Sequence, residues 1–124
     1  MSKLKNAHGG VVAPRGFLCA GVSCGIKTLA GARDLGLIVS DVPAAAAAVF
    51  SRNRVASHTK AVNQARLRRT RHWGIVVNAG NANACNGPKG LAGARRMVAL
   101  AAECTGAEPG DFPVSYTHLT LPTN

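Results

Sequence analysis

The sequence predicts a mixed α/β fold, because short β-branched runs alternate with amphipathic helical patterns. Residues 75–77 form such a run between Gly74 and Gly80, which is typical of a buried strand. Residues 91–101 repeat small and aliphatic side chains at helical spacing. Hydrophobic residues make up 47% of the 124 residues and argue against disorder, whereas aromatic residues make up 4%. We therefore expect one small domain with a core of Ala, Val, Leu and Ile, marginally stable by itself.

The first two elements expected along the chain are strands. Residues 16–26 alternate loosely between small and apolar side chains, and residues 27–33 form a polar turn that ends at Asp34. Residues 35–39 are apolar throughout, which predicts a strand covered on both faces. Pro43 cannot donate a backbone hydrogen bond and restricts the residue before it, so we expect this strand to end there.

The middle of the chain predicts one helix. The alanines of residues 44–48 favour a helix by intrinsic propensity alone. Residues 59–69 show apolar side chains on adjacent helical turns and predict the first helix, with residues 69–72 linking it to the next strand. His58 and His72 have no matching catalytic or metal-ligating partners in the sequence, so we expect them to be exposed or packing residues.

An Asn/Gly-rich turn over residues 78–87 joins the central strand to the second helix. Pro88 fits the first turn of that helix, Gly106 fits its C-terminal cap, and Pro109 prevents a restart. Free N–H groups and the positive end of the helix dipole at this turn favour anions or polarised carbonyls. Because Asn and Gly are also ordinary turn residues, a turn that merely satisfies its own backbone explains the pattern as well.

The net charge is +10, from 15 Lys and Arg against 5 Asp and Glu, and a basic surface commonly signals nucleic acid. The densest basic cluster, residues 66–71, is not interleaved with aromatic residues, so we expect no nucleic-acid partner. One alternative is a small basic binding module for RNA or an acidic partner. Another is that an acidic segment outside this sequence offsets the charge.

The sequence shows neither a targeting segment nor an apolar run of the ~20 residues that a membrane span requires, so we expect a cytoplasmic protein without membrane contact. None of its four cysteines forms a C-x-x-C pair. We expect no metal site, no cofactor, and cysteines that are reduced and buried. These cysteines are Cys19, Cys24, Cys85 and Cys104.

Three blocks of sequence carry a resemblance to a known family. Residues 76–87, which read VVNAGNANACNG, and residues 90–97 strongly resemble the ornithine acetyltransferase family of arginine biosynthesis. A second block over residues 37–55 resembles the family's sequence motifs and has them in the same order, and a third over residues 13–27 is similar to the family's N-terminus. The chain is therefore identified as a member of the bifunctional ornithine acetyltransferase/N-acetylglutamate synthase family.

The resemblance implies a layered sheet-and-helix sandwich of the ornithine acetyltransferase type, incomplete in this fragment. Residues 1–113 then correspond to the N-terminal part of the α chain of a precursor that cuts itself. The resemblance also implies that residues 44–48 lead into an extended segment, and we therefore predict a strand there rather than a helix. The expected partner is the β chain from the same precursor, in a heterotetramer of two α and two β chains.

The activity implied is glutamate N-acetyltransferase, an acyltransferase that moves acetyl from N-acetylornithine to glutamate, with acetyl-CoA as a possible further substrate. In the family the threonine freed by self-cleavage is both base and nucleophile. Neither it nor the oxyanion-hole donors correspond to any position here, so we assign no catalytic residue and expect this fragment alone to be inactive. Asn78, Asn81 and Asn83 are predicted to lie near the acetyl-transfer pocket, because amides at a helix N-terminus can orient a carboxylate.

The last eleven residues have a different character. In the family the strand after Pro113 continues into a Thr-Gly oxyanion loop, whereas residues 114–124 read VSYTHLTLPTN. This segment resembles a translation of sequencing-adapter DNA. We therefore predict that residues 114–124 are a non-native tail.

Overall fold

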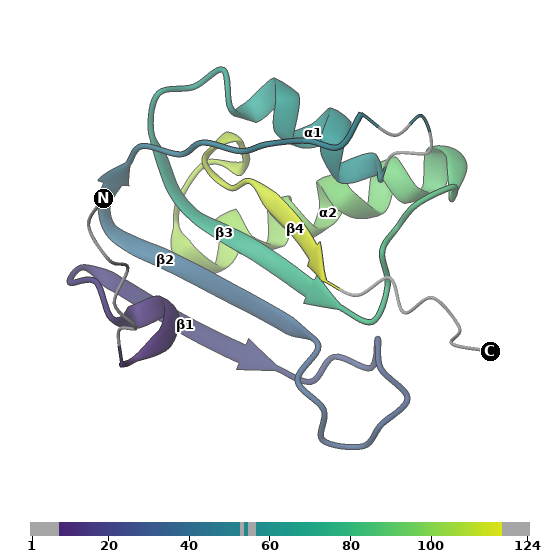
Figure 1. Cartoon of the computed structure of the whole chain (residues 1–124), viewed down its shortest axis with the longest axis horizontal. Coiled ribbons are helices and arrows are strands. Elements are labelled where there is room, and N and C mark those ends of the chain that lie inside the picture. The colour runs from purple at the N-terminus through teal and green to yellow at the C-terminus, as the bar shows by residue number, and fades with distance from the viewer. Residues whose placement is uncertain (1–7, 53, 55–56, 118–124) are drawn as a thin grey trace, which may run out of the picture.

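The computed structural model describes residues 8–52, 54 and 57–117, which form one sheet with helices on one side (Figure 1). The sheet has the order β1-β2-β3-β4. Its strands are β1 (Phe17–Val22), β2 (Leu35–Ala44), β3 (His72–Ala79) and β4 (Val114–Thr117). The helices are α1 (His58–Arg66) and α2 (Gly87–Thr105), with short 3₁₀ turns η1 (Gly10–Val12) and η2 (Pro109–Asp111).

The direction of the strands places the Asn-rich turn at one edge of the sheet. β1, β2 and β3 are antiparallel neighbours, whereas β3 and β4 run parallel and are connected through α2. The carboxyl ends of β3 and β4 therefore meet at the same edge, where Asn78 is paired with Tyr116. Ligands of α/β proteins commonly bind at the carboxyl ends of parallel strands.

The core lies between β3, β4 and the helices. Its most deeply buried large side chains include Val98 of α2, Phe112 and Val114. Partly buried Leu35 and Leu37 of β2 pack against it. The remaining core residues are Val62, Val76, Ala94, Ala101 and Ala102. As predicted, small and aliphatic residues make up most of this core.

Both predicted helices are present. α2 begins just before Pro88 and ends at Gly106, whose φ of 71° is the left-handed conformation that favours glycine. α1 begins one residue earlier than predicted, because Ser57 caps it by accepting a hydrogen bond from the Thr59 backbone N–H. It ends three residues early, at Arg66, and Leu67 is its C-terminal cap.

The predictions for the first two strands are wrong in their bounds, and the strand predicted at residues 44–48 does not form beyond Ala44. β1 covers only residues 17–22 of the predicted 16–26. β2 continues through Pro43 to Ala44, because the pairing with β3 shifts between Val39 and Ala44 and an irregularity of this kind tolerates a residue without an N–H. Residues 45–48 are neither strand nor helix, since no neighbouring strand pairs with them.

Predictions about burial also need correction. Residues 35–39 are only half-buried rather than covered on both faces, and Ile75 is 38% exposed, because α1 and α2 lie on one side of the sheet (Figure 1). All four cysteines are exposed, although each is a free thiol as expected. Cys19 lies on β1, Cys24 and Cys85 lie in loops, and Cys104 lies at an exposed position of α2, so none of them faces the core.

Candidate functional site

The candidate site begins at the carboxyl end of β3. Asn78 is 4% exposed and faces the same side of the sheet as its paired neighbours Leu35 and Tyr116. Its amide nitrogen donates a hydrogen bond to the Asn81 carbonyl at 3.0 Å. Asn78 therefore holds the start of the turn that leads to α2.

Asn83 is the residue that connects this turn to its surroundings. It is 8% exposed, and its Nδ2 donates to the Gly90 carbonyl of α2 at 2.7 Å and to the Tyr116 hydroxyl at 2.9 Å. Its Oδ1 accepts a hydrogen bond from Asn86 Nδ2 at 3.0 Å. Asn83 adopts a φ of 45°, a conformation that asparagine tolerates better than most residues.

Asn81 differs from the other two predicted asparagines because it is exposed. Its Oδ1 accepts a hydrogen bond from the Asn83 backbone N–H at 2.8 Å, which closes a tight local turn. The structure thus brings Asn78, Asn81 and Asn83 together, with two side chains buried and one at the surface.

The N-terminus of α1 also contacts this turn. Ser57 Oγ donates to the Ala82 carbonyl at 3.0 Å, and the His58 backbone N–H donates to the Asn83 carbonyl at 3.3 Å. Gly90 of α2 lies against both the His58 ring and Asn83 Oδ1, so closely that a Cβ at this position would collide with them. The turn is therefore held from two helices and two strands.

A cavity of about 440 Å³ opens beside these asparagines. Its lining residues are Asn78, Asn81, Asn83, Asn86, Lys89, Gly90, Gly93, Met97 and Tyr116. Lys89 and the first turn of α2 give the cavity positive charge, and burial raises the pKa of Tyr116. Among these lining residues there is no carboxylate, imidazole or thiol, so the cavity offers amide, ammonium and hydroxyl groups for binding rather than a nucleophile with its base.

The ArgJ family model matches residues 18–119. The chain belongs to the ArgJ family.

Two curated relatives give the extent of the similarity. The arginine biosynthesis bifunctional protein ArgJ of Bacillus licheniformis is 37% identical over 115 residues, which are 92% of this chain and 28% of that protein. The protein of the same name from Symbiobacterium thermophilum is 42% identical over 110 residues, or 88% of this chain and 27% of that protein. The chain thus spans little more than a quarter of the length of these ArgJ relatives.

Two solved structures share the fold. The ArgJ structure from Bacillus halodurans has a TM-score of 0.77 and 35% identity, covering 87% of this chain and 58% of that chain. The ornithine acetyltransferase of Mycobacterium tuberculosis, solved in complex with ornithine, has a TM-score of 0.73 and 38% identity, covering 89% of this chain and 61% of that chain. The predicted α/β fold of the ornithine acetyltransferase type is confirmed.

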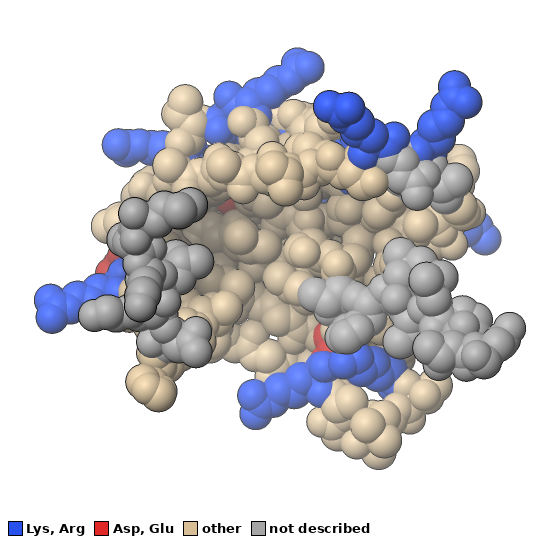
Figure 2. Space-filling view, in the orientation of Figure 1, with Lys and Arg blue, Asp and Glu red and all other residues tan. Residues whose placement is uncertain are grey.

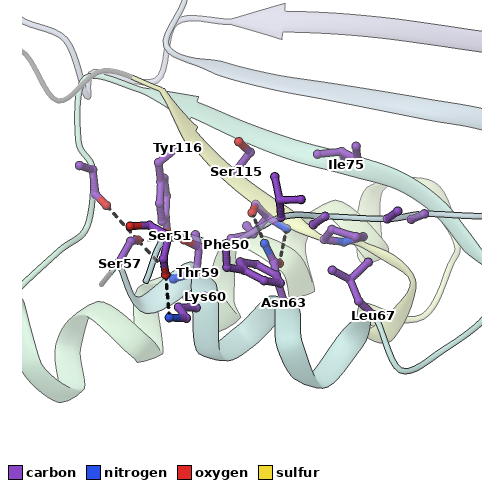
Figure 3. Close-up of a pocket in the computed structure, with 17 residues that line it drawn as sticks. Phe50, Ser51, Ser57, Thr59, Lys60, Asn63, Leu67, Ile75, Ser115 and Tyr116 are labelled. Atoms are coloured by element: carbon purple, nitrogen blue, oxygen red, sulfur yellow. Dashed lines mark hydrogen bonds between the residues drawn. The ribbon is translucent and has the colours of Figure 1, made fainter. Parts of the chain in front are cut away.

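A second cavity in this ArgJ chain, of about 560 Å³, lies between residues 46–51, α1 and β4 (Figure 3). Phe50, Leu67 and Ile75 give part of its lining an apolar character. In another part of the lining, Lys60 donates a hydrogen bond to the Ser51 carbonyl at 2.9 Å. The sequence did not predict this cavity, because it depends on the irregular path of a segment that was expected to form a strand.

Asp34 is a further buried group without a predicted role. Its carboxylate, 1% exposed, accepts backbone hydrogen bonds from Cys24, Ile26 and Lys27 at 2.7, 2.7 and 3.0 Å. These bonds, of which the one from the Cys24 N–H has the largest effect, hold the pKa of Asp34 well below its usual range. The hydrogen bond with Asp34 in turn raises the pKa of the Cys24 thiol. Asp34 therefore anchors the loop between β1 and β2. The sequence signal for this role was the position of Asp34 as a lone acidic residue between a polar turn and a strand.

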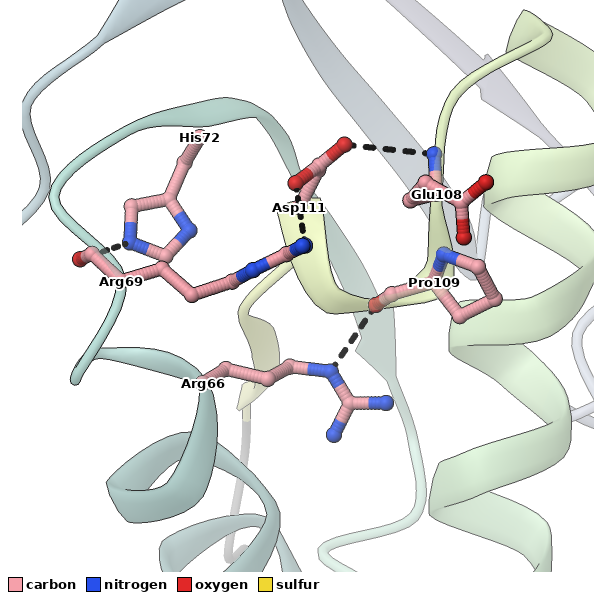
Figure 4. Close-up of polar contacts among 6 residues, drawn as sticks. All are labelled: Arg66, Arg69, His72, Glu108, Pro109 and Asp111. Carbon is pink, nitrogen blue, oxygen red and sulfur yellow. Dashed lines mark hydrogen bonds and ion pairs between the residues drawn. The ribbon is translucent and has the colours of Figure 1, made fainter.

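A polar cluster joins the end of α1 to η2 (Figure 4). Arg69 forms an ion pair with Asp111 at 2.6 Å, and Arg66 Nε donates to the Pro109 carbonyl at 3.0 Å. Burial lowers the pKa of Arg66, with a smaller contribution from Arg95. His72, 3% exposed, contacts the Arg69 carbonyl through Nε2 at 3.2 Å. These contacts fit the packing role expected for His72.

Metal and membrane features can be assessed over residues 8–52, 54 and 57–117. Within these ranges, no group of three His, Cys, Asp or Glu side chains is arranged to hold a metal ion. None of the helices in the same ranges combines the length and the apolar character needed to cross a membrane.

Proposed function

We propose that this chain is the N-terminal part of a glutamate N-acetyltransferase that transfers acetyl from N-acetylornithine to glutamate. The observation that carries the proposal is the ArgJ family match over residues 18–119. The similarity to an ornithine acetyltransferase solved with ornithine supports the small-molecule substrates. Acetyl-CoA is a second possible acetyl donor, and the reaction needs no resident cofactor.

The lengths of the relatives support processing of a precursor. The matched stretch is 28% of the full-length Bacillus licheniformis protein but 58% of the solved Bacillus halodurans chain. The solved chain is therefore about half as long as the full-length relative, as expected if ArgJ precursors are cut into two chains. This chain then contributes to the α chain of a cytoplasmic heterotetramer with two β chains.

The proposed chemistry is acyl transfer through a covalent intermediate. A threonine hydroxyl attacks the acetyl carbonyl of N-acetylornithine, the C–N bond breaks, and the departing amine of ornithine takes the proton. The amine of glutamate then attacks the threonine ester, the ester C–O bond breaks, and the proton lost by the amine restores the threonine hydroxyl. The threonine and the oxyanion donors belong to parts of the protein outside this chain, which supplies the scaffold beside them.

The Asn-rich turn is the part of this chain that we place beside the acetyl-transfer pocket. It lies at the carboxyl edge of the parallel strands β3 and β4, next to a cavity of about 440 Å³ with Lys89 in its lining. Amide groups and an ammonium can orient the carboxylate that ornithine and glutamate have in common. In this proposal Asn78, Asn81 and Asn83 shape the pocket without taking part in bond breaking.

The test uses a chimera, here called the ArgJ chimera, in which residues 18–113 replace the matching segment of the Mycobacterium tuberculosis enzyme. We expect it to be cleaved into two chains and to transfer acetyl from N-acetylornithine to glutamate. The unmodified enzyme is the positive control. A chimera that folds but yields no acetylglutamate contradicts the proposal.

The basic composition favours a second candidate function, a binding module for RNA or an acidic partner. Figure 2 shows Lys and Arg side chains at several separate places around one face, with few acidic groups among them. Retention on an anionic column does not identify such a module, because any protein of charge +10 is retained. Saturable, sequence-selective RNA binding by the 124-residue chain supports this function, and weak binding that is indifferent to sequence counts against it.

A further inference from the structure

Asp34 is a buried carboxylate that the proposed acetyl transfer does not use, and it joins two segments of the chain. Its side chain accepts three backbone hydrogen bonds from the loop over residues 24–27, here called the 24–27 loop. Its own backbone carbonyl accepts a hydrogen bond from the Ala79 N–H at 2.8 Å. Ala79 is the last residue of β3 and the second residue of the Asn-rich turn. Asp34 is therefore bonded both to the 24–27 loop and to the start of the turn.

The 24–27 loop also contacts the turn directly, at Gly80. Gly80 has a φ of 105°, in the left-handed region that favours glycine. A Cβ at this position would lie 2.8 Å from Lys27 Cγ and 3.3 Å from Ile26 Cγ2, so the two segments leave little room between them. Lys27 and Ile26 are also two of the three residues whose N–H groups Asp34 binds. A shift of the loop therefore acts on the turn at Gly80.

Gly80 lies between two asparagines of the candidate site. Asn78 Nδ2 donates to the Asn81 carbonyl at 3.0 Å, and this hydrogen bond spans Gly80. Asn78 also lines a small cavity of about 160 Å³ together with Asp34, and on the other side it lines the cavity of about 440 Å³. The contacts thus run from Asp34 through the loop and Gly80 to the asparagines beside the larger cavity.

The donors that face Asp34 suit a carboxylate and not an amide. Oδ1 accepts from the Cys24 N–H, and Oδ2 accepts from the Ile26 and Lys27 N–H groups. An amide of the same size has one acceptor oxygen, and its NH₂ group would face a backbone donor. Asp34→Asn is therefore expected to loosen the loop with almost no change in side-chain volume.

We propose that Asp34 is a positioning residue, which holds the Asn-rich turn in place through the 24–27 loop and thereby fixes the geometry of the acetyl-transfer pocket. The inference rests on the proposed function, because that function places the pocket beside this turn. A residue that acts on stability alone changes the amount of folded enzyme. It does not change the affinity of the folded enzyme for its substrates.

The first test measures kcat and KM separately for Asp34→Asn in the ArgJ chimera, well below its melting temperature. Since the turn is proposed to orient the substrates without taking part in bond breaking, we expect KM for N-acetylornithine to rise about fivefold or more, with a smaller change in kcat. Asp41→Asn, the same substitution at an exposed position of β2, is the matched control and should leave both constants unchanged. An unchanged KM in Asp34→Asn overturns the proposal, whether or not kcat falls, because a lower kcat alone reflects fewer folded molecules.

Lys27→Ala tests the contact with the turn. It removes the side-chain atom nearest to a Cβ at Gly80 and keeps the N–H that Asp34 binds. If Asp34 acts through this contact, Lys27→Ala also raises KM, and the double variant with Asp34→Asn raises KM by less than the product of the two single effects. Single effects that multiply would overturn the route through Gly80.

Hydrogen exchange tests the same link without an activity assay. In Asp34→Asn we expect the exchange rates of the amides of residues 79–83 to rise by at least about tenfold more than those of residues 94–101, in the core-facing part of α2. An equal change in the two segments overturns the proposal. A parent chimera without acetyl transfer contradicts the proposed function, whereas hydrogen exchange still decides whether Asp34 holds the turn, so the two failures are distinguishable.

Discussion

Asn83 combines a buried amide with a backbone conformation that few residues tolerate. Its side chain bonds to Gly90 and Asn86, and its φ is 45°. We predict that Asn83→Leu in the ArgJ chimera lowers acetyl transfer or self-cleavage by about tenfold or more, because the buried amide that holds the turn beside the proposed pocket is lost; a tenfold loss corresponds to about 1.4 kcal/mol in activation free energy. Steady-state kinetics and the fraction of cleaved precursor measure the effect.

The comparison variant is Asn83→Gly, which tolerates the positive φ but lacks the amide. If the amide orients the pocket, both variants lose activity, and Asn83→Leu is also less stable because leucine is strained in the left-handed region. Unchanged kinetics together with unchanged stability in Asn83→Leu would remove the idea that this turn shapes the pocket.

The buried carboxylate of Asp34 leads us to predict that the stability of the ArgJ chimera depends on pH. Its carboxylate accepts three backbone hydrogen bonds and its pKa is lowered on folding, so its contribution is present above the unfolded pKa of about 3.9 and is lost as the pH falls toward the folded value. We expect Asp34→Asn to lower the melting temperature of the ArgJ chimera near pH 7, because the amide NH₂ faces backbone donors. The difference from the parent narrows below about pH 4.

The matched control for Asp34 is Glu103→Gln, which removes the same charge at an exposed position of α2. It should leave the melting temperature nearly unchanged throughout the pH range. Equal melting curves for Asp34→Asn and the parent at pH 7 would show that the loop does not depend on this carboxylate.

At this scale the sequence singled out the three asparagines but not the aspartate, and the place of the asparagines beside an acetyl-transfer pocket stays a prediction. Asn78, Asn81 and Asn83 lie within one turn of ten residues, so their proximity follows from chain continuity alone. Asp34 reaches donors seven to ten residues away, at Lys27, Ile26 and Cys24, and a loop that folds back in this way has no periodicity to reveal it. The family resemblance did not assign it a role.

At the scale of elements, the packing of α2 against the turn depends on Gly90. A Cβ at Gly90 would collide with the His58 ring and lie 2.5 Å from Asn83 Oδ1, whereas a Cβ at Gly93 meets nothing within 4 Å. We predict that Gly90→Ala destabilises the ArgJ chimera by roughly 1–3 kcal/mol through overpacking. Gly93→Ala should stabilise it by up to about 1 kcal/mol through helix propensity.

Chemical denaturation of the two glycine variants measures this difference. Both substitutions add the same methyl group to the same helix, so propensity alone predicts that both stabilise. Equal stabilisation by Gly90→Ala and Gly93→Ala would contradict the close contact between α2, α1 and the Asn-rich turn.

The open edge of β4 is closed by a side chain of α1. Asn63 Nδ2 donates to the Val114 carbonyl at 2.7 Å, and the Val114 N–H donates to Asn63 Oδ1 at 2.8 Å. We predict that Asn63→Leu costs the 124-residue chain roughly 1–3 kcal/mol for each Val114 backbone group left without a partner. Gln64→Leu, at an exposed position one residue along, is the control; equal unfolding midpoints for the two variants would contradict this role.

These contacts to β4 involve only its backbone, and they bear on the predicted tail. A strand can pair with β3 and with Asn63 through many side-chain sequences, so the prediction that residues 114–124 are not native stays a prediction. Sequencing the source DNA outward from codons 74–106 and past codon 113 tests it. A frame that continues into a Thr-Gly loop supports the prediction, and a confirmed stop after Asn124 contradicts it.

Among the elements, local patterns predicted types better than bounds. The helical spacing and the flanking Pro88 and Gly106 defined α2 closely, because the residues that cap a helix adjoin it in sequence. Residues 44–48 were wrongly expected to be a strand, since strand formation requires a partner and none pairs with them beyond Ala44. The burial of β2 was also mispredicted, because the sequence of a strand does not state which of its faces other elements cover.

At the scale of the whole molecule, charge and exposure both bear on stability. The net charge of +10 and the exposed apolar side chains of β1 are unfavourable features for an isolated domain. The matched stretch is 28% and 27% of the two ArgJ relatives, so those proteins contain much chain without a counterpart among the matched residues.

The most direct measurement is acetyl transfer by the ArgJ chimera, with purified protein, N-acetylornithine and glutamate. We predict two chains on a denaturing gel and formation of N-acetylglutamate at a rate within about tenfold of the Mycobacterium tuberculosis enzyme, a difference of roughly 1.4 kcal/mol in activation free energy. A folded chimera that is not cleaved and forms no N-acetylglutamate would contradict the claim that this chain builds part of an acetyltransferase.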